Sequence, residues 1–119
     1  MLSCNSAVCQ AVPEADREGR NMFASIRKYK VRRGMVEELA RRVKEGFVPL
    51  MRGMQGWKGY YLLDGGPDVL ITISIFDNAD EALASNTIAA DWVRDNVLEF
   101  TKGMPDVMAG EVLVAEVKL

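Results

Sequence analysis

The sequence predicts an α+β domain whose elements follow the order β-α-β-β-α-β. A hydrophobic, β-branched run at 69–76 has the composition of a central strand. A turn signal, Asp-Gly-Gly-Pro-Asp, joins it to the aromatic run 57–63 and predicts a hairpin. A last strand is predicted over 106–117, with Gly110 at a bulge. With an amphipathic helix on either side of the hairpin, this is the ferredoxin-like arrangement, in which helices cover one face of a four-stranded antiparallel sheet.

Length and composition limit the class of protein. The chain has 119 residues, of which 49% are hydrophobic and 27% charged, and this fits one compact domain. A formal net charge of -2, without a basic patch interleaved with aromatic residues, gives no reason to expect a nucleic-acid partner. No apolar run approaches the roughly 20 residues needed to span a bilayer, so we expect no membrane segment and a cytoplasmic location.

The sequence contains no histidine. This removes histidine acid–base catalysis, histidine-ligated haem and most zinc sites. We therefore expect a function that uses neither a metal nor another cofactor.

Residues 1–21 read unlike the rest of the sequence. They lack a basic region followed by an apolar stretch, so we do not expect a secretory signal. We expect a loosely ordered leader, followed by a single domain over 22–119. Both cysteines, Cys4 and Cys9, fall in this leader, where they could form a local bridge or a functional thiol pair but not a disulfide scaffold.

The first predicted strand, 22–31, carries Arg27 and Tyr29 on the same face. These two side chains either point into a pocket or lie on the surface with packed stems. On the second interpretation, Arg27 could pair with Glu111 or Glu116 of the last strand.

The first helix is predicted from Met35 to Met51. Its apolar stripe consists of Val36, Leu39, Ala40, Val43, Phe47 and Leu50. Pro49 should kink or tighten the last turns, because proline lacks an N–H donor. Gly53 and Gly56 supply the exit from the helix.

The central run 69–76 has two different faces. One face carries Val69, Ile71, Ile73 and Ile75, and it is apolar enough to lie beneath the helices. The other face carries Leu70, Thr72, Ser74 and Phe76, which is mixed but still contains large apolar side chains. Since nothing in the chain covers this second face, we expect it to pack sheet to sheet against a second copy related by a two-fold axis.

The second helical region begins near Asp77 or Asn78, either of which can cap a helix, and it ends near Phe100. Its apolar face, as one helix or as two short helices in line, consists of Ala82, Asn86, Ala89, Val93, Val97 and Phe100. Asn86 is the polar member of this line, and Trp92 lies beside it.

Four features occur together in chain order. They are a helix that ends in Gly-Met-Gln-Gly-Trp at 53–57, a strand with Tyr60-Tyr61, a strand that ends in Phe76-Asp77, and a second helix with Ser85 and Trp92. In this combination, over about 22–119, the chain resembles the antibiotic biosynthesis monooxygenase superfamily. The resemblance implies a dimeric α/β barrel. It also implies membership of a group that includes cofactor-free monooxygenases, quinol oxidases and haem-degrading enzymes, although the haem-degrading branch needs a histidine that is absent here.

The resemblance implies a pocket between sheet and helices for a small aromatic or quinol-type substrate. We expect Arg27, Asn86 and Trp92 to be catalytic: Arg27 would stabilise a phenolate, Asn86 would donate from its amide, and Trp92 would donate its N–H or stack on the ring. We expect the substrate to contact Tyr29, Tyr60, Tyr61 and Phe76. Tyr60 and Tyr61 alternate in direction, so at most one of them points into a given cavity.

Other interpretations remain open at this stage. Trp92 could be a core filler, and Asn86 could bond to nearby backbone. The same dimer could bind a small hydrophobic ligand without turnover. It could also be an isomerase or lyase, which would need a carboxylate such as Asp91 or a tyrosine as its base.

Overall fold

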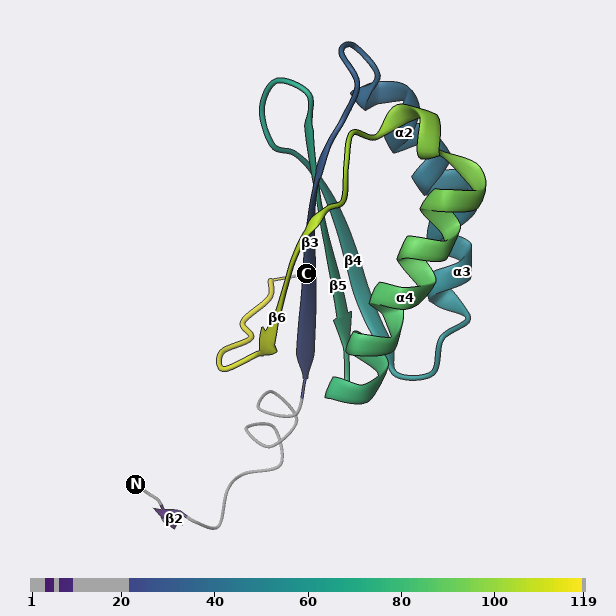
Figure 1. Cartoon of the computed structure of the whole chain (residues 1–119). Helices are drawn as coiled ribbons and strands as arrows, with labels where there is room; N and C mark the ends of the chain where they lie inside the picture. Colours follow the sequence, from purple (N-terminus) through teal and green to yellow (C-terminus); the bar gives the residue numbers. More distant parts are fainter. Residues whose placement is uncertain (1–3, 6, 10–21, 119) are drawn as a thin grey trace.

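The computed structural model describes residues 4–5, 7–9 and 22–118 (Figure 1). Within residues 1–21 it describes two short antiparallel strands, β1 (Cys4–Asn5) and β2 (Ala7–Cys9). The predicted loose order of the leader, and the role of the Cys4 and Cys9 side chains, fall outside the described part.

Four strands form one antiparallel sheet in the spatial order β4-β5-β3-β6. The strands are β3 (Phe23–Lys30), β4 (Trp57–Asp64), β5 (Val69–Phe76) and β6 (Asp106–Glu111). The helical segments are α2 (Val36–Arg42), η1 (Val43–Phe47), α3 (Val48–Arg52), α4 (Ala79–Asn96) and η2 (Leu98–Phe100). Figure 1 shows α2, α3 and α4 on one side of the sheet. The predicted ferredoxin-like order of elements is confirmed, and no helix of the described residues is long and apolar enough to cross a membrane.

The two faces of β5 are exchanged relative to the prediction. The buried row is Leu70, Thr72, Ser74 and Phe76, while Val69, Ile71, Ile73 and Ile75 are only half-buried. On β3 the register partners of this buried row include Tyr29, Arg27 and Ser25, which are buried as well. The prediction was wrong because it placed the more apolar row in the core, whereas the interior of this protein has to provide polar partners for Arg27. The open face of the sheet is therefore the isoleucine face.

The first helix contains a π-helical segment, η1, that the sequence analysis did not foresee. It ends just before Pro49, which lies at the start of α3. Proline has no N–H to donate to the carbonyl four residues earlier, so a wider turn forms at this point. The extra residue of that turn rotates the helix that follows: the predicted core residue Leu50 is 46% exposed, and Met51 is fully buried instead.

The second helical region was predicted correctly as a helix that begins near Asn78. The Asn78 side chain caps α4 by accepting a 2.8 Å hydrogen bond from the backbone N–H of Glu81. Asp80 and Glu81 lie in the first turn, where the helix dipole favours negative charge. The region continues into the short 3-10 helix η2, so it consists of two helices in line.

The last strand is shorter than predicted, because it ends at Glu111 and not at Val117. Its pairing partner β3 starts at Phe23, and the final ladder bond joins the Val112 N–H to the Met22 carbonyl. Gly110 pairs with Ala24 in regular register, so the predicted bulge is absent from β6. The last strand thus ends opposite the first residues of β3, although its own sequence stays strand-like.

The exchange of Leu50 and Met51 can be tested by truncation. We expect Met51→Ala to lower the free energy of unfolding by about 2–5 kcal/mol, because it empties a fully buried position. We expect Leu50→Ala to lower it by less than about 1 kcal/mol, because that side chain is largely in water. Urea unfolding of the two variants measures both values. Equal losses would contradict the rotated register of α3.

Candidate functional site

The site is organised around Arg27, which is 1% exposed on β3 beneath the helices. One terminal nitrogen of its guanidinium donates to Asn86 Oδ1 at 2.8 Å, and the other donates to Ser74 Oγ at 2.9 Å. Among the described residues no carboxylate forms an ion pair with it, so the predicted partners Glu111 and Glu116 do not neutralise it. Arginine keeps its charge in proteins, and Arg27 is therefore a buried positive charge held by neutral groups.

Asn86 connects α4 to this charge. Its Oδ1 accepts hydrogen bonds from Arg27 and, at 2.6 Å, from Ser25 Oγ. Arginine can only donate, so the oxygen of the amide must face Arg27 and the NH₂ group must face away from it. Asn86 also lines the larger of the two cavities described next, where this NH₂ group can donate to a ligand.

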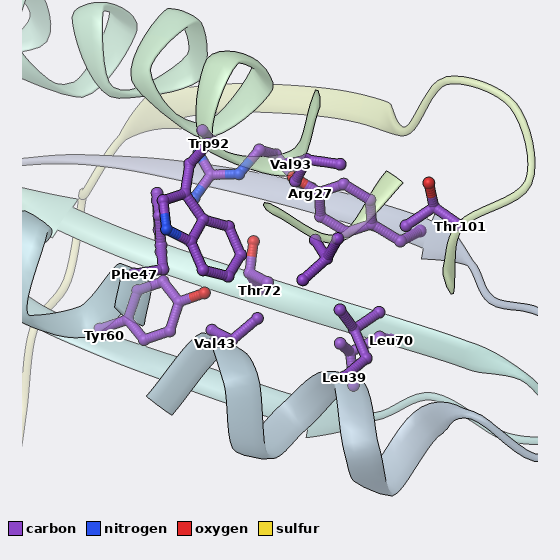
Figure 2. A pocket seen from close by; sticks show the side chains of 13 residues that line it. Arg27, Leu39, Val43, Phe47, Tyr60, Leu70, Thr72, Trp92, Val93 and Thr101 are labelled. Carbon is purple, nitrogen blue, oxygen red and sulfur yellow. The ribbon is translucent and has the colours of Figure 1, made fainter. Parts of the chain in front are cut away.

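Two neighbouring cavities meet at Arg27. The inner pocket, shown in Figure 2, has a volume of about 20 Å³. It is lined by Arg27, Tyr29, Leu39, Val43, Phe47, Tyr60, Leu70, Thr72, Ala89, Trp92, Val93, Val97 and Thr101. The outer cleft has a volume of about 470 Å³. It is lined by Arg27, Tyr29, Asn86, Thr87, Ala90, Val93, Arg94, Leu98, Thr101, Gly103, Met104, Pro105 and Val107.

Aromatic side chains form one end of the inner pocket (Figure 2). The Phe47 ring lies 5.8 Å from the ring of Tyr60 and 5.5 Å from that of Trp92, between centroids. The Arg27 guanidinium carbon lies 5.9 Å from the Phe47 centroid, within range of a cation–π contact. Gly46 lets the Trp92 ring pack close to the first helix, because a Cβ at position 46 would lie 2.9 Å from that ring. The π-helical segment thus supplies both the aromatic ring at Phe47 and the space for Trp92.

The polar groups of the inner pocket are donors at neutral pH. Burial raises the pKa of Tyr60 to about 12, and it also raises the pKa of Tyr29. The charge of Arg27 lowers both pKa values, but burial has the larger effect. Arg27 Nε and Thr72 Oγ1 are buried without a hydrogen-bond partner. These unpaired groups make the neighbourhood of Arg27 suited to an electron-rich guest.

The structure brings together five of the seven predicted site residues. Arg27, Tyr29, Tyr60, Asn86 and Trp92 all line one or both cavities. The interpretation of Arg27 and Tyr29 as surface residues was wrong, because both are buried.

Two predicted substrate contacts lie elsewhere. Tyr61 is 55% exposed on the open face of the sheet, opposite in direction to Tyr60. Phe76 is fully buried in the core and lines neither cavity. Aromatic character alone suggested these two residues, and it does not determine which face of a strand a side chain occupies.

Sequence reasoning missed three small polar residues of the site. Ser25, Thr72 and Ser74 are buried around Arg27, and two of them bond within its network. The available signal was their position, since Ser25 lies two residues before Arg27 on the same face of its strand, and Thr72 and Ser74 are successive residues on one face of β5.

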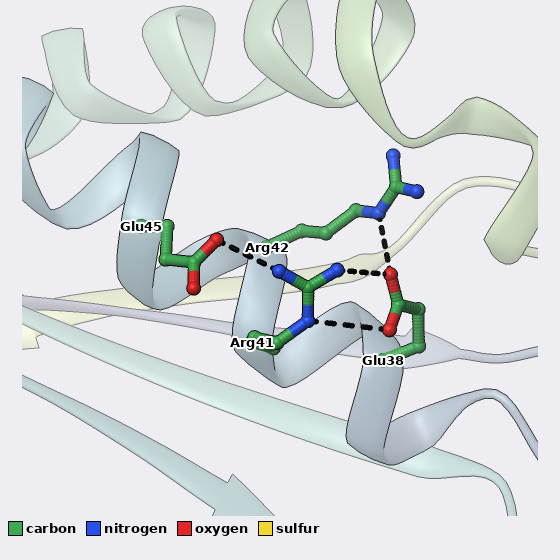
Figure 3. A network of polar contacts seen from close by, with 4 residues as sticks. All are labelled: Glu38, Arg41, Arg42 and Glu45. Carbon is green, nitrogen blue, oxygen red and sulfur yellow. Dashed lines mark hydrogen bonds and ion pairs between the residues drawn. The ribbon is translucent and has the colours of Figure 1, made fainter.

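The most extended charged network among the described residues joins side chains of the first helix (Figure 3), and none of its members lines either cavity. Glu38 bonds to Arg41 and Arg42, and Arg41 also reaches Glu45 at 2.8 Å. The hydrogen bond from Arg41 is the main cause that holds the pKa of Glu38 below its usual value. The guanidinium carbon of Arg42 also lies 4.9 Å from the centroid of the Phe100 ring, so this network helps to hold the first helix against η2. It has the character of a solvated stabilising surface.

No protein-family model and no curated protein matches the chain. Among solved structures, a protein of unknown function from Nitrosomonas europaea superposes with a TM-score of 0.70 at 19% identity, covering 85% of this chain and 98% of that one. A Bordetella bronchiseptica protein classed with the antibiotic biosynthesis monooxygenases superposes with a TM-score of 0.65 at 20% identity, covering 76% of this chain and 96% of that one. A monooxygenase from the ActVA-Orf6 gene of Streptomyces coelicolor, solved with nanaomycin D, superposes with a TM-score of 0.65 at 11% identity, covering 84% of this chain and 95% of that one. The resemblance to the antibiotic biosynthesis monooxygenases in fold is confirmed.

Metal ligands do not gather in the described part of the chain. Within residues 4–5, 7–9 and 22–118, no three cysteine, aspartate or glutamate side chains lie close enough to hold a metal ion. A ligand in the site could contact the fixed cation of Arg27, the amide donor of Asn86, hydroxyl groups and apolar walls.

The raised pKa of Tyr60 predicts how stability depends on pH. Between about pH 10 and 12 a tyrosine of the unfolded chain loses its proton, whereas Tyr60 in the folded protein keeps it. The unfolded state then binds fewer protons, so the free energy of unfolding should fall as pH rises through this window. Tyr60→Phe should make the fall shallower. Urea midpoints at a series of pH values measure it, and an equally steep fall in the variant would contradict the shift.

Proposed function

We propose that this protein is a small monooxygenase-like enzyme that oxidises a small aromatic, quinol-type substrate without a metal or haem. The observation that supports this is the buried charge of Arg27 at the floor of a cleft of about 470 Å³. That volume is within the usual range for small-molecule sites. A fixed cation facing such a cleft suits a substrate that develops negative charge on oxygen.

In the proposed reaction a phenol or enol loses its hydroxyl proton to water and becomes an electron-rich phenolate or enolate. The carbon of this anion that is oxidised still carries one hydrogen atom. The carbon then bonds to O₂, and the resulting peroxide takes up a proton and loses water. One oxygen atom becomes a carbonyl, and the other leaves in the water molecule.

Residues of the chain would hold the reactants in place. The substrate ring would lie in the outer cleft, with its oxygen anion against Arg27 and the Asn86 NH₂ group. The inner pocket, at about 20 Å³, has room for a molecule the size of water or O₂. Trp92 and Phe47 would keep that pocket dry, which protects a reactive peroxide from water.

A catalytically inactive binding protein is the alternative that an observation favours. No aspartate or glutamate of the described residues lines either cavity, so an isomerase or lyase would lack a carboxylate base from this part of the chain. The predicted base Asp91 instead bonds to Arg94 on the exposed side of α4. Bound ligand without turnover would distinguish the binding protein from the oxygenase.

We also propose that the protein is a homodimer packed through the open face of its sheet. The isoleucine row of β5 is flanked on this face by Tyr61 and Leu63 of β4, Ile26 of β3 and Met108 of β6. An apolar face of this extent usually marks an interface. A second copy presents the same face, and a two-fold axis makes it self-complementary.

The oxygenase proposal predicts a loss of turnover in two variants. With a responsive quinol, Arg27→Met and Asn86→Ala should lower kcat by on the order of 10²-fold or more, because each removes a donor to the developing anion. Oxygen consumption in an electrode cell measures the rate, and Arg33→Met, on the exposed turn after β3, serves as the matched control. Parent rates in both variants would remove these residues from the mechanism.

The dimer proposal predicts a change in mass after one substitution. Ile73→Lys places a charge at the centre of the open face and should convert the dimer to a monomer. Leu83→Lys is the control, because Leu83 is exposed on α4. Native mass spectrometry measures the oligomeric state of each protein. A parent protein that is already monomeric would refute the proposed interface.

A further inference from the structure

Among the described residues, the lining of the two cavities contains hydrogen-bond donors but no strong base. The charged residues among the lining are Arg27 of β3 and Arg94 of α4. The other polar members carry hydroxyl or amide groups: Tyr29, Tyr60, Thr72, Asn86, Thr87 and Thr101. None of these groups can take a proton from a phenol at neutral pH. The part of the site that the structure describes therefore has no residue that would activate a neutral substrate by deprotonation.

The two arginines differ in how their charges are balanced. Arg94 is exposed, and it bonds to Asp91 at 3.1 Å and to Asp95 at 2.9 Å. Arg27 is buried, and the side chains to which it bonds among the described residues, Asn86 and Ser74, are neutral. An unbalanced buried charge is costly, so an anion placed against Arg27 gains much more than it would at the rim.

Acidic side chains near the site do not supply this anion. On α4, Asp91 and Asp95 are exposed, pair with Arg94 and line neither cavity. β6 contributes only Val107 to the outer cleft, and Glu99 of η2 lines neither cavity. From the first helix, Phe47 and Val43 reach the inner pocket, while Glu45 pairs with Arg41 outside. The position opposite Arg27 is thus left for a ligand.

We propose that the outer cleft selects a ligand that is already an anion in solution: a flat, acidic enol or phenol conjugated to a carbonyl group. Its oxygen anion lies between Arg27 and the Asn86 NH₂ group, and its ring lies against the apolar wall formed by Val93, Leu98 and Met104. The proton leaves to water before binding, so the protein needs no base. This inference rests on the site of the proposed function and narrows its substrate class.

A matched pair of ligands tests the selection. The probes are 2-hydroxy-1,4-naphthoquinone, an acidic enol that is ionised at neutral pH, and 2-methoxy-1,4-naphthoquinone, its neutral ether of nearly the same shape. Isothermal titration calorimetry at neutral pH should give at least about tenfold tighter binding of the anion. The preference should disappear when the pH is lowered until the enol is protonated. Equal affinities at neutral pH would overturn the inference.

Substitution at Asn86 provides a variant that keeps the fold. Asn86→Asp preserves the shape of the side chain and its acceptor for Ser25 and Arg27, but it gives Arg27 a permanent counter-charge. The affinity for the anion should therefore fall until the two probes bind about equally well. Arg94→Met, which removes a charge already balanced at the rim, should retain the preference. Loss of the preference in Arg94→Met, or its survival in Asn86→Asp, would overturn the assignment to Arg27.

Oxygen consumption separates this inference from the proposed function. Selective binding of the anion without consumption of O₂ would support the inference and refute the oxygenase in favour of a binding protein. Oxidation of a quinol without any preference for an anion would support the oxygenase and overturn the inference.

Discussion

A single buried charge constrains much of this structure. Arg27 lies under the helices, and no carboxylate of the described residues pairs with it, so the surrounding elements supply neutral acceptors and an aromatic face. Asn86 from α4, Ser74 from β5 and Phe47 from the first helix each contribute one contact. The charge therefore couples three elements that are distant in sequence, and it explains why polar side chains occupy the interior row of the central strand.

The same constraint accounts for the position of the apolar residues. Since the inner face of β5 is occupied by residues that accommodate Arg27, its isoleucine row faces outward. An isolated chain of this kind has an apolar face in water, which is unfavourable on its own. The proposed chemistry in the pocket and the proposed association through the open face thus involve opposite sides of one strand.

Sequence reasoning predicted the order of elements well, because that information is local. The β-branched run of β5, the Asp-Gly-Gly-Pro-Asp turn and the Asn78 cap each specify a structure within a few residues. It also found Arg27 and Asn86, because a charge or an amide in an apolar pattern stands out. It failed where the answer depends on the whole fold. Which face of β5 is inside, and which side of β4 carries the pocket, follow from contacts made across the sheet and not from hydrophobicity along one strand.

The number of residues in the π-helical segment helps to determine which side chains form the aromatic end of the inner pocket. A π-turn holds one residue more than an α-helical turn, and each residue of a helix advances the chain by about 100° around its axis. Phe47 meets Tyr60 and Trp92 because of this one additional residue, as well as because of the side chains themselves. Relatives of this fold that lack the extra residue would carry a straight helix and a different wall opposite the arginine. A change in chain length by one residue, with no change in any side chain of the pocket, is therefore a route by which such a fold can acquire a new ligand.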